Sequence, residues 1–326
     1  MVRRMLGALA LMGAALATTT PVQAQNWPDK PIRLVVAYPA GGGVDIVART
    51  VGQRLSEVLK QQVVIENRTG ASGTIGADSV AKAAPDGYTF LLASPAEVLV
   101  GPIAGQKTAY NPESDLVPVA LAGETPLVII TNPAVPVKDI KDLVAYAKGR
   151  PGKLSYATPG NGSSMHFAGE SLKAQTGISL AHVPYRGAAP ALNDVLGNQV
   201  PVGIMGMPPV VAHAKAGRVN IVAVTTSKRS SVFPNVPSVA ELPGLKDYAF
   251  TNWMAVFAPA KTPQAVVDRF GAELARAVKE PAVRDKLLAA GVEPMGIAGT
   301  EFTAWLAAER KRYQEVATSR GIRFEE

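Results

Sequence analysis

Short apolar runs rich in β-branched residues alternate with longer segments of helical period along most of the chain. This alternation is typical of βα units packed around a largely parallel sheet, so it predicts an α/β fold. The first unit is expected to be a strand over 32–38 followed by a helix over 44–60, whose apolar residues share one face. The chain has 326 residues, which exceeds the size at which one core usually stops growing, and two domains are therefore expected.

The later units follow the same pattern and divide into two lobes. We expect lobe 1 to comprise 25–125 and 245–326, and lobe 2 to comprise 126–244, with a ligand cleft between them. The proline-rich stretch 233–243 is interpreted as a return crossing between the lobes. Further strands are expected at 63–66, 88–93, 127–131, 154–158, 182–183, 200–204, 221–225 and 249–258, and further helices near 76–84, 139–148, 164–175, 190–196 and 210–216.

The sequence predicts the N-termini of two helices in the C-terminal part of the chain. Thr262 is expected to cap a helix that has Pro263 at its first position. Thr300 is expected to start a final amphipathic helix that carries Phe302, Trp305, Glu309 and Tyr313. This last segment is expected to rejoin lobe 1.

The first residues have the order of a secretory signal peptide. Arg3 and Arg4 precede an apolar run over 5–17, and small and polar residues then lead to an A-x-A-like end at Ala24. We expect cleavage after Ala24 and export to the periplasm. The apolar run is shorter than the roughly 18 residues that a spanning helix needs. The chain has no cysteine, which excludes a disulfide and a thiolate metal site.

The charge balance argues against a nucleic-acid partner. Residues 1–24 hold two arginines and no acid, so their removal lowers the formal net charge from +7 to +5. The remaining Lys and Arg residues are spread along the chain beside acids, without the dense basic runs that would mark a phosphate-backbone footprint.

The loop 38–45 lies between the first strand and the first helix. Its glycines let backbone amides approach a ligand, and a helix start favours an anion, so the loop is interpreted as an anion cradle. The alternative is a flexible turn in which Asp45 satisfies the helix dipole as a first-turn acid. The P-loop and dinucleotide-binding patterns are not matched. The candidate ligand-binding residues here are Tyr38, Ala40, Gly41, Gly42 and Asp45.

The loop 158–166 repeats this design in the second lobe. Ser163 or Ser164 is expected to cap the following helix, in addition to any contact with a ligand. No G-x-S-x-G elbow surrounds these serines, and the three histidines lack metal-ligand spacing, so neither a nucleophile nor a metal site is expected. The candidate ligand-binding residues of this loop are Thr158, Gly160, Asn161, Ser163, Ser164 and His166.

A third strand-to-helix junction over 183–191 belongs to the same lobe. Tyr185 is placed to close over a ligand, and the amides of Gly187 and Ala188 are candidate donors to its carboxylate. Arg186 is interpreted as a solvated charge, because long basic side chains usually stay in water.

Together these segments closely resemble the substrate-binding receptors of tripartite tricarboxylate transporters, the Bug family of periplasmic proteins. The segments that carry the resemblance are 27–32, 39–45, 66–70, 84–89, 160–166, 184–191 and 258–263. The resemblance implies a two-lobed periplasmic-binding-protein fold of type II-like form and binding of carboxylates mainly by backbone amides and water. It also implies docking on large and small membrane subunits, and it points to 38–45, 158–166 and 185–190 as the site.

Two positions depart from the family pattern. Gly206 stands near the end of a strand where the family often has an Asp, and Pro95-Ala96-Glu97 follow Ser94 where small polar residues are common. Ser94 and Glu97 are added to the candidate site. If Glu97 faces the cleft, the ligand should bring an ammonium or amide group to it, as an amino acid does. The alternative is that Glu97 caps the helix that begins near Pro95 and points to solvent.

The sequence thus predicts a monomeric periplasmic solute-binding receptor for a small organic acid or amino acid, with no cofactor and no enzymatic activity. Two alternatives stay open. One is a receptor that serves a sensor kinase, and the other is a secreted hydrolase or isomerase that uses Ser164 and His166.

Overall fold

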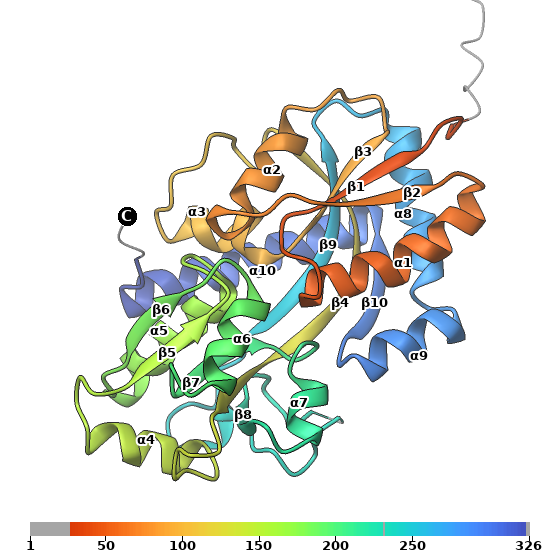
Figure 1. Cartoon of the computed structure of the whole chain (residues 1–326). Coiled ribbons are helices and arrows are strands. Elements are labelled where there is room, and N and C mark those ends of the chain that lie inside the picture. The colour runs from red at the N-terminus through yellow and green to blue at the C-terminus, as the bar shows by residue number, and fades with distance from the viewer. Residues whose placement is uncertain (1–26, 231, 324–326) are drawn as a thin grey trace, which may run out of the picture.

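The computed structural model describes residues 27–230 and 232–323. The expected signal peptide over 1–24 lies outside the described residues. Within them the chain forms an α/β fold around one curled sheet of ten strands (Figure 1). The strands are β1 (Ile32–Val36), β2 (Val63–Asn67), β3 (Thr89–Ala93), β4 (Leu116–Thr131), β5 (Ser155–Thr158), β6 (Ala181–Pro184), β7 (Val202–Gly206), β8 (Asn220–Val224), β9 (Thr251–Pro259) and β10 (Glu293–Ala298).

The strand order is β2-β1-β3-β9-β4-β7-β5-β6, and β8 and β10 also pair with β4. Pairing is parallel among β1, β2 and β3 and among β5, β6 and β7. Every pairing that involves β4 or β9 is antiparallel, so the sheet is mixed rather than largely parallel as predicted. The two strands that reverse direction are also the ones that join the two halves of the molecule.

The helices cover this sheet and mostly follow strands, as the alternation predicts. The longer ones are α1 (Gly43–Leu59), α2 (Thr74–Ala81), α4 (Ile140–Lys148), α5 (Ser164–Thr176), α6 (Ala188–Leu196), α8 (Gln264–Ala277), α9 (Pro281–Ala289) and α10 (Gly299–Arg320). The short helical segments are η1 (Ala71–Gly73), η2 (Ala96–Val100), α3 (Gly101–Ile103), α7 (Val211–Lys215) and η3 (Val239–Glu241).

Strand β4 is much longer than the predicted strand 127–131. It pairs with β9 as far as Pro126 and changes partners at Leu127, from which it pairs with β7 and β8. Pro118 and Pro126 hide the first part of this strand in the sequence, because proline is rare within sheets. The structure accommodates this part with irregular register between β4 and β9.

The chain returns between the two halves later than predicted. The stretch 233–243 stays beside β8, where Ser238 bridges to Val224. The return comes at Phe250, whose amide donates to Thr225, and at Thr251, which pairs with Pro126. A division of the sheet at Leu127 and Phe250 separates an upper group of elements from a lower, green group in Figure 1, and we keep the two-lobe assignment as a proposal on this basis.

The predicted cap of α8 is wrong in detail. The Thr262 hydroxyl donates to the Pro259 carbonyl instead of accepting from the helix, and Pro263 itself is the N-cap, so that the helix begins at Gln264. Helix α10 begins one residue before the expected Thr300. Ser163, in contrast, caps α5 as predicted by accepting from the His166 amide at 3.1 Å.

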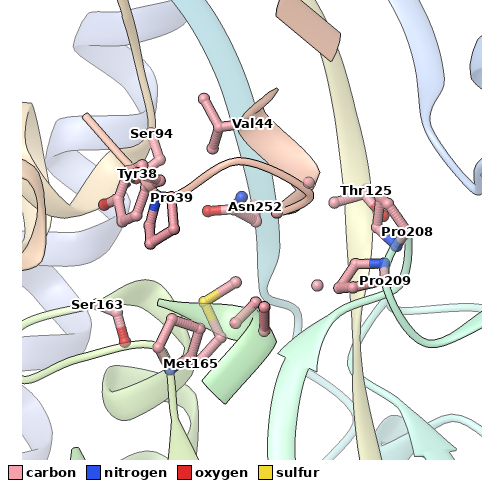
Figure 2. Close-up of a pocket in the computed structure, with 16 residues that line it drawn as sticks. Tyr38, Pro39, Val44, Ser94, Thr125, Ser163, Met165, Pro208, Pro209 and Asn252 are labelled. Atoms are coloured by element: carbon pink, nitrogen blue, oxygen red, sulfur yellow. Dashed lines mark hydrogen bonds between the residues drawn. The ribbon is translucent and has the colours of Figure 1, made fainter. Parts of the chain in front are cut away.

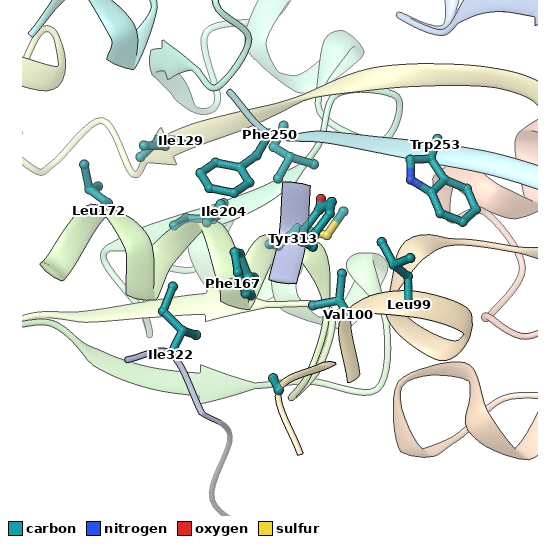
Figure 3. Packing of buried hydrophobic residues seen from close by; sticks show 14 of the residues in the cluster. Leu99, Val100, Ile129, Phe167, Leu172, Ile204, Phe250, Trp253, Tyr313 and Ile322 are labelled. Carbon is teal, nitrogen blue, oxygen red and sulfur yellow. The ribbon is translucent and has the colours of Figure 1, made fainter. Parts of the chain in front are cut away.

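The apolar core continues from one half of the molecule to the other. Helix α10 starts beside β9, where Phe302 lies edge-on to Phe257. Its later turns reach α5, and Tyr313 packs against Phe167 and Phe250 (Figure 3). The C-terminal helix therefore contacts both lobes instead of only lobe 1.

None of the helices in the described residues combines the length and apolarity that a membrane span requires.

Candidate ligand-binding site

A pocket lies between the two groups of strands, where the loops after several strands meet (Figure 2). Its cavity volume is about 40 Å³, and the surrounding empty space of about 570 Å³ includes open solvent. In Figure 2, Tyr38, Pro39 and Ser94 approach it from one side and Ser163 and Met165 from the other. The residues that line it are Tyr38, Pro39, Gly42, Gly43, Val44, Ser94, Thr125, Pro159, Ser163, Met165, Ala188, Ala189, Gly206, Pro208, Pro209 and Asn252.

The chemistry of this lining is neutral. None of the described residues that line the pocket is an Asp, Glu, Lys, Arg or His. Prolines, Val44, Met165 and two alanines make most of the wall, and hydroxyl groups and the Asn252 amide are its polar side chains. A wall of this kind can hold an apolar body and meet a polar group with hydrogen bonds.

Three helices begin at the pocket. The starts of α1, α5 and α6 contribute Gly43, Met165 and Ala188 to its lining. At α1 and α6 the N-cap is a glycine, and among the described residues no side chain caps either helix. Free first-turn amides together with the helix dipole attract an anion. The pocket therefore offers backbone donors to an anion although its side chains are neutral.

Asp45 stabilises the first loop from within. Its carboxylate is buried and accepts from the Gly41 amide at 2.9 Å, from Arg49 at 2.9 Å and from Asn67 at 2.9 Å. Burial alone would raise the pKa of Asp45, but these hydrogen bonds together hold it below its usual value. Asp45 thus shapes the loop without lining the pocket, whereas Ala40 and Gly41 are exposed.

The second loop is closed by its own side chains. The buried Thr158 hydroxyl bonds the His182 ring at 2.7 Å, and the His166 ring stacks on His182 with centroids 3.7 Å apart. The His166 Nδ1 atom accepts from the Gly162 amide at 3.3 Å. Burial, and for His166 also the neighbouring His182, lowers the pKa of His166 to about 3, and burial lowers that of His182 to about 4. Both rings are therefore neutral at physiological pH.

The third junction has one close approach that requires glycine. Gly187 has a φ of +123°, and a Cβ atom there would lie 2.8 Å from Pro39 of the first loop. Tyr185 points its hydroxyl at Asp194, with which it is hydrogen-bonded. It lines a second hollow beside the pocket together with Gly160, Asn161, Gly187 and the exposed Arg186.

The two lobes touch at this second hollow. The Ser72 hydroxyl in η1 donates to the Asn161 carbonyl, and an added Cβ at Gly160 would overlap that hydroxyl. Ala71 and Ser72 hold φ values of 45° and 52°, which non-glycine residues rarely adopt. The strained η1 segment thus carries Ser72 across to the other lobe.

Glu97 fits neither predicted alternative fully. It accepts from the Ser94 amide at 2.8 Å, as a capping acid does, but it is fully buried and does not point to solvent. It also stays behind Tyr38 and Ser94 and does not line the pocket. Burial raises its pKa to about 7, against the lowering effect of its hydrogen bonds.

The expected candidates divide into three groups. Tyr38, Gly42, Ser94, Ser163 and Ala188 line the pocket. Gly160, Asn161, Tyr185 and Gly187 line the second hollow, together with Tyr38. Ala40, Gly41, Asp45, Glu97, Thr158, Ser164 and His166 line neither.

Sequence reasoning missed the residues that the crossing strands and the β7 loop supply. These are Thr125 of β4, Asn252 of β9, and Pro208 and Pro209 after β7. A polar residue near the start of the otherwise apolar strand β9 is the sequence signal that could have pointed to Asn252.

The arrangement of Ser164 and His166 does not support hydrolase activity. The Ser164 hydroxyl donates to Asn252 at 3.1 Å, whereas His166 faces His182, Gly162 and Glu170. In the described part of the chain no three His, Cys, Asp or Glu side chains gather as a metal site would require.

Known proteins share this architecture. The family model described as "Tripartite tricarboxylate transporter family receptor" matches residues 47–322. Protein BugT of Bordetella pertussis is 36% identical over 320 residues, covering 97% of this chain and 98% of the relative. The structure of R. palustris Rpa4515 with adipate superimposes with a TM-score of 0.87 at 34% identity, covering 91% and 99% of the two chains. MatC from Rhodopseudomonas palustris with bound malate gives a TM-score of 0.83 at 30% identity, covering 89% and 99%.

Proposed function

This chain belongs to the tripartite tricarboxylate transporter receptor family, and from that premise we propose that it captures a small carboxylate in the periplasm and delivers it to the membrane subunits of such a transporter. The family is one of receptors, so the chain is a receptor and not an enzyme. The proposed periplasmic location rests on this membership and on the leader-like residues 1–24.

The observation that carries the proposal is the meeting of three helix starts at a pocket without charged side chains. Amides at helix starts form charge-assisted hydrogen bonds with a carboxylate, each worth about 1.5–3 kcal/mol. The apolar walls add hydrophobic contact for the rest of the ligand. These features favour a carboxylate with an apolar chain.

The same lining disfavours an amino acid. Gly206 brings no acid to the pocket, and Glu97 is screened by Tyr38 and Ser94. An ammonium group would therefore lose its water without gaining a direct acidic partner. We propose that a dicarboxylate with an apolar chain, of the kind that adipate represents, is preferred over a hydroxylated or aminated one.

Thermal-shift and calorimetric titrations with adipate, malate, aspartate and the neutral adipamide test this order. A ligand at 100 times its Kd adds about 2.7 kcal/mol and raises Tm by several degrees. We expect the largest shift for adipate, smaller shifts for malate and aspartate, and none for adipamide. If adipamide raises Tm as much as adipate does, the ligand is not recognised as an anion. If no acid of a wider panel raises Tm, the proposed function is wrong.

The membrane partner is tested in the cell. If the chain serves a transporter, deletion of its gene should abolish uptake of the labelled carboxylate. Intact uptake combined with loss of ligand-induced transcription would instead indicate a receptor for a sensor kinase. N-terminal sequencing of the exported protein should begin at Gln25 if the leader is cleaved as proposed.

A further inference from the structure

We propose that Glu97 is a proton-carrying group of this pocket, and that a carboxylate ligand binds together with one proton that Glu97 holds. The inference rests on the proposed function in one respect, which is that the ligand is an anion. It concerns a residue that does not line the pocket and acts through two residues that do, Tyr38 and Ser94.

The geometry consists of three side-chain oxygen atoms in mutual hydrogen-bond contact. The Tyr38 hydroxyl lies 2.8 Å from the Ser94 hydroxyl and 2.8 Å from Glu97 Oε2, and the Ser94 hydroxyl lies 2.8 Å from the same Oε2 atom. The Tyr38 hydroxyl also lies 3.1 Å from the Ser72 carbonyl, which can only accept. Glu97 Oε1 is already occupied by the Ser94 amide at 2.8 Å.

A count of hydrogens indicates which protonation state fits this arrangement. Four oxygen–oxygen contacts need donors, and the two hydroxyl groups supply one hydrogen each. If Glu97 is ionised, two contacts have no hydrogen and oppose lone pairs. If Glu97 is protonated, each of the three side chains donates to the next around the triangle, and only the longer contact with the Ser72 carbonyl, at 3.1 Å, has no hydrogen. The compact triangle is therefore the arrangement of a neutral carboxylic acid.

The surroundings of Glu97 favour this neutral form. Within the described residues Glu97 forms no ion pair, and its side chain is fully buried. Gly73 of η1 closes one side, because a Cβ atom there would lie 2.9 Å from the Glu97 carboxyl carbon. Burial is the largest influence on its pKa, which it raises to about 7.

The titratable groups that face Glu97 or its partners in the described residues are mainly tyrosines and acids. Tyr38 comes from the loop after β1, and burial followed by Glu97 raises its pKa well above the usual value. Tyr110 donates its hydroxyl to the Glu97 carbonyl at 2.5 Å, and Asp78 of α2 faces Tyr110. On the side of α5, His166 is turned to His182 and Glu170, and Lys107 after α3 is exposed.

The state of Glu97 decides what the pocket wall offers to a ligand. An ionised Glu97 draws both hydroxyl hydrogens toward itself, so Tyr38 and Ser94 present lone pairs and a nearby negative charge to the pocket. A protonated Glu97 donates into the triangle and removes that charge. A bound carboxylate stabilises the protonated form, which means that binding raises the pKa of Glu97 and takes up a proton.

The sign of the pH dependence follows from this linkage. Affinity is highest where Glu97 is protonated before binding, and it falls as pH rises through the pKa of about 7 in the free protein. We expect adipate to bind about tenfold more weakly at about pH 8.5 than at about pH 6.5.

Calorimetric titration of adipate in two buffers of different ionisation enthalpy tests proton uptake. At about pH 7.5 the wild-type protein should take up between about 0.3 and 0.8 proton per ligand, because about a quarter of Glu97 is already protonated there. Glu97→Gln places an amide donor where the acid hydrogen lies, so it should still bind, take up no proton and lose the pH dependence. Glu124→Gln is the matched control, because Glu124 on β4 also has a pKa raised by burial but lies outside the pocket lining. The control should retain the wild-type uptake.

A ligand-free measurement separates failure of this inference from failure of the proposed function. In carbon-13 NMR of protein labelled at glutamate carboxyls, the resonance that Glu97→Gln removes should titrate with a midpoint well above the usual glutamate value. A midpoint near the usual value, or tight adipate binding without proton uptake, overturns the role of Glu97. Absence of binding by any carboxylate, with the high midpoint intact, overturns the proposed function and the coupled uptake, but leaves Glu97 as a proton-carrying side chain.

Discussion

The loops 38–45 and 158–166 both join a strand to a helix, but they differ in how the first amides of that helix are used. Each joins a parallel strand to a helix through glycines. In the first loop the N-cap is Gly42, no described side chain caps α1, and Asp45 reaches back to the Gly41 amide before the helix. In the second loop Ser163 caps α5 and the His166 ring accepts from Gly162. The first loop keeps its amides for a ligand, whereas the second uses part of its own for rigidity.

The largest difference between the two loops is expected in acid, because the groups that stabilise them titrate in different pH ranges. A histidine with a lowered pKa stabilises the fold above about pH 6.5, and this contribution is lost as pH falls through the folded pKa, about 4 for His182 and about 3 for His166. Asp45, whose pKa is also lowered, keeps its contribution until pH falls below about 4. Between about pH 6.5 and pH 4, only the second of the two loops should therefore become less stable. The loss should be up to about 1.4 kcal/mol per pH unit for each histidine.

The measurement is Tm against pH for the wild type and His166→Gln. Glutamine can still accept from the Gly162 amide but does not titrate, so the slope between about pH 6.5 and 4.5 should become shallower. His213→Gln is the control, because His213 lies on α7 away from the pocket. An unchanged slope in His166→Gln would show that the stacked pair does not set the acid limit.

The next largest effect is expected in the first loop. Gly42 has an ordinary φ of −75°, so Gly42→Val should fold, but its side chain would stand beside the free amides of α1. Loss of one or two charge-assisted bonds predicts a Kd for adipate that is about 100-fold higher. Gly149→Val, at an exposed helix end with a φ of −74°, is the control and should bind normally. Wild-type affinity in Gly42→Val would move the ligand away from α1.

These two loops could be predicted from the sequence because the residues that define them are neighbours along the chain. The glycines, the cap at Ser163 and the strand–loop–helix order follow from neighbours along the chain. Thr125 and Asn252 were not predicted, because they meet only when β4 and β9 pair across 127 positions. The interior prolines of β4 concealed that strand, and the burial of Glu97 depends on Tyr38, which is 59 positions away.

A smaller effect is expected where the lobes touch. Gly160→Ala places a methyl group on the Ser72 hydroxyl, which must move and release Asn161, so we expect Kd to rise about tenfold. Ser72→Ala removes the hydroxyl, and the added Cβ at residue 160 then meets only the Ser72 Cβ atom at 3.5 Å. The double variant should therefore bind as well as Ser72→Ala alone. Additive losses in the double variant would contradict a contact between these residues in the protein that binds the ligand.

The smallest effects are expected when the serine cap is removed from α5 or introduced at α1. Ser163→Ala removes the cap of α5 and should lower the free energy of unfolding by about 1 kcal/mol, with Tm about 2 °C lower. Affinity should fall less than about threefold, since the remaining first-turn amides of α5 are unaffected. Gly42→Ser should do the reverse: the new hydroxyl can accept from an α1 amide, which raises stability by a few tenths of a kcal/mol and weakens adipate binding about tenfold. Denaturant unfolding and calorimetry measure both quantities for each variant. If Ser163→Ala weakens binding as much as Gly42→Ser does, Ser163 is itself a ligand donor, and the two loops contribute to the site in the same way.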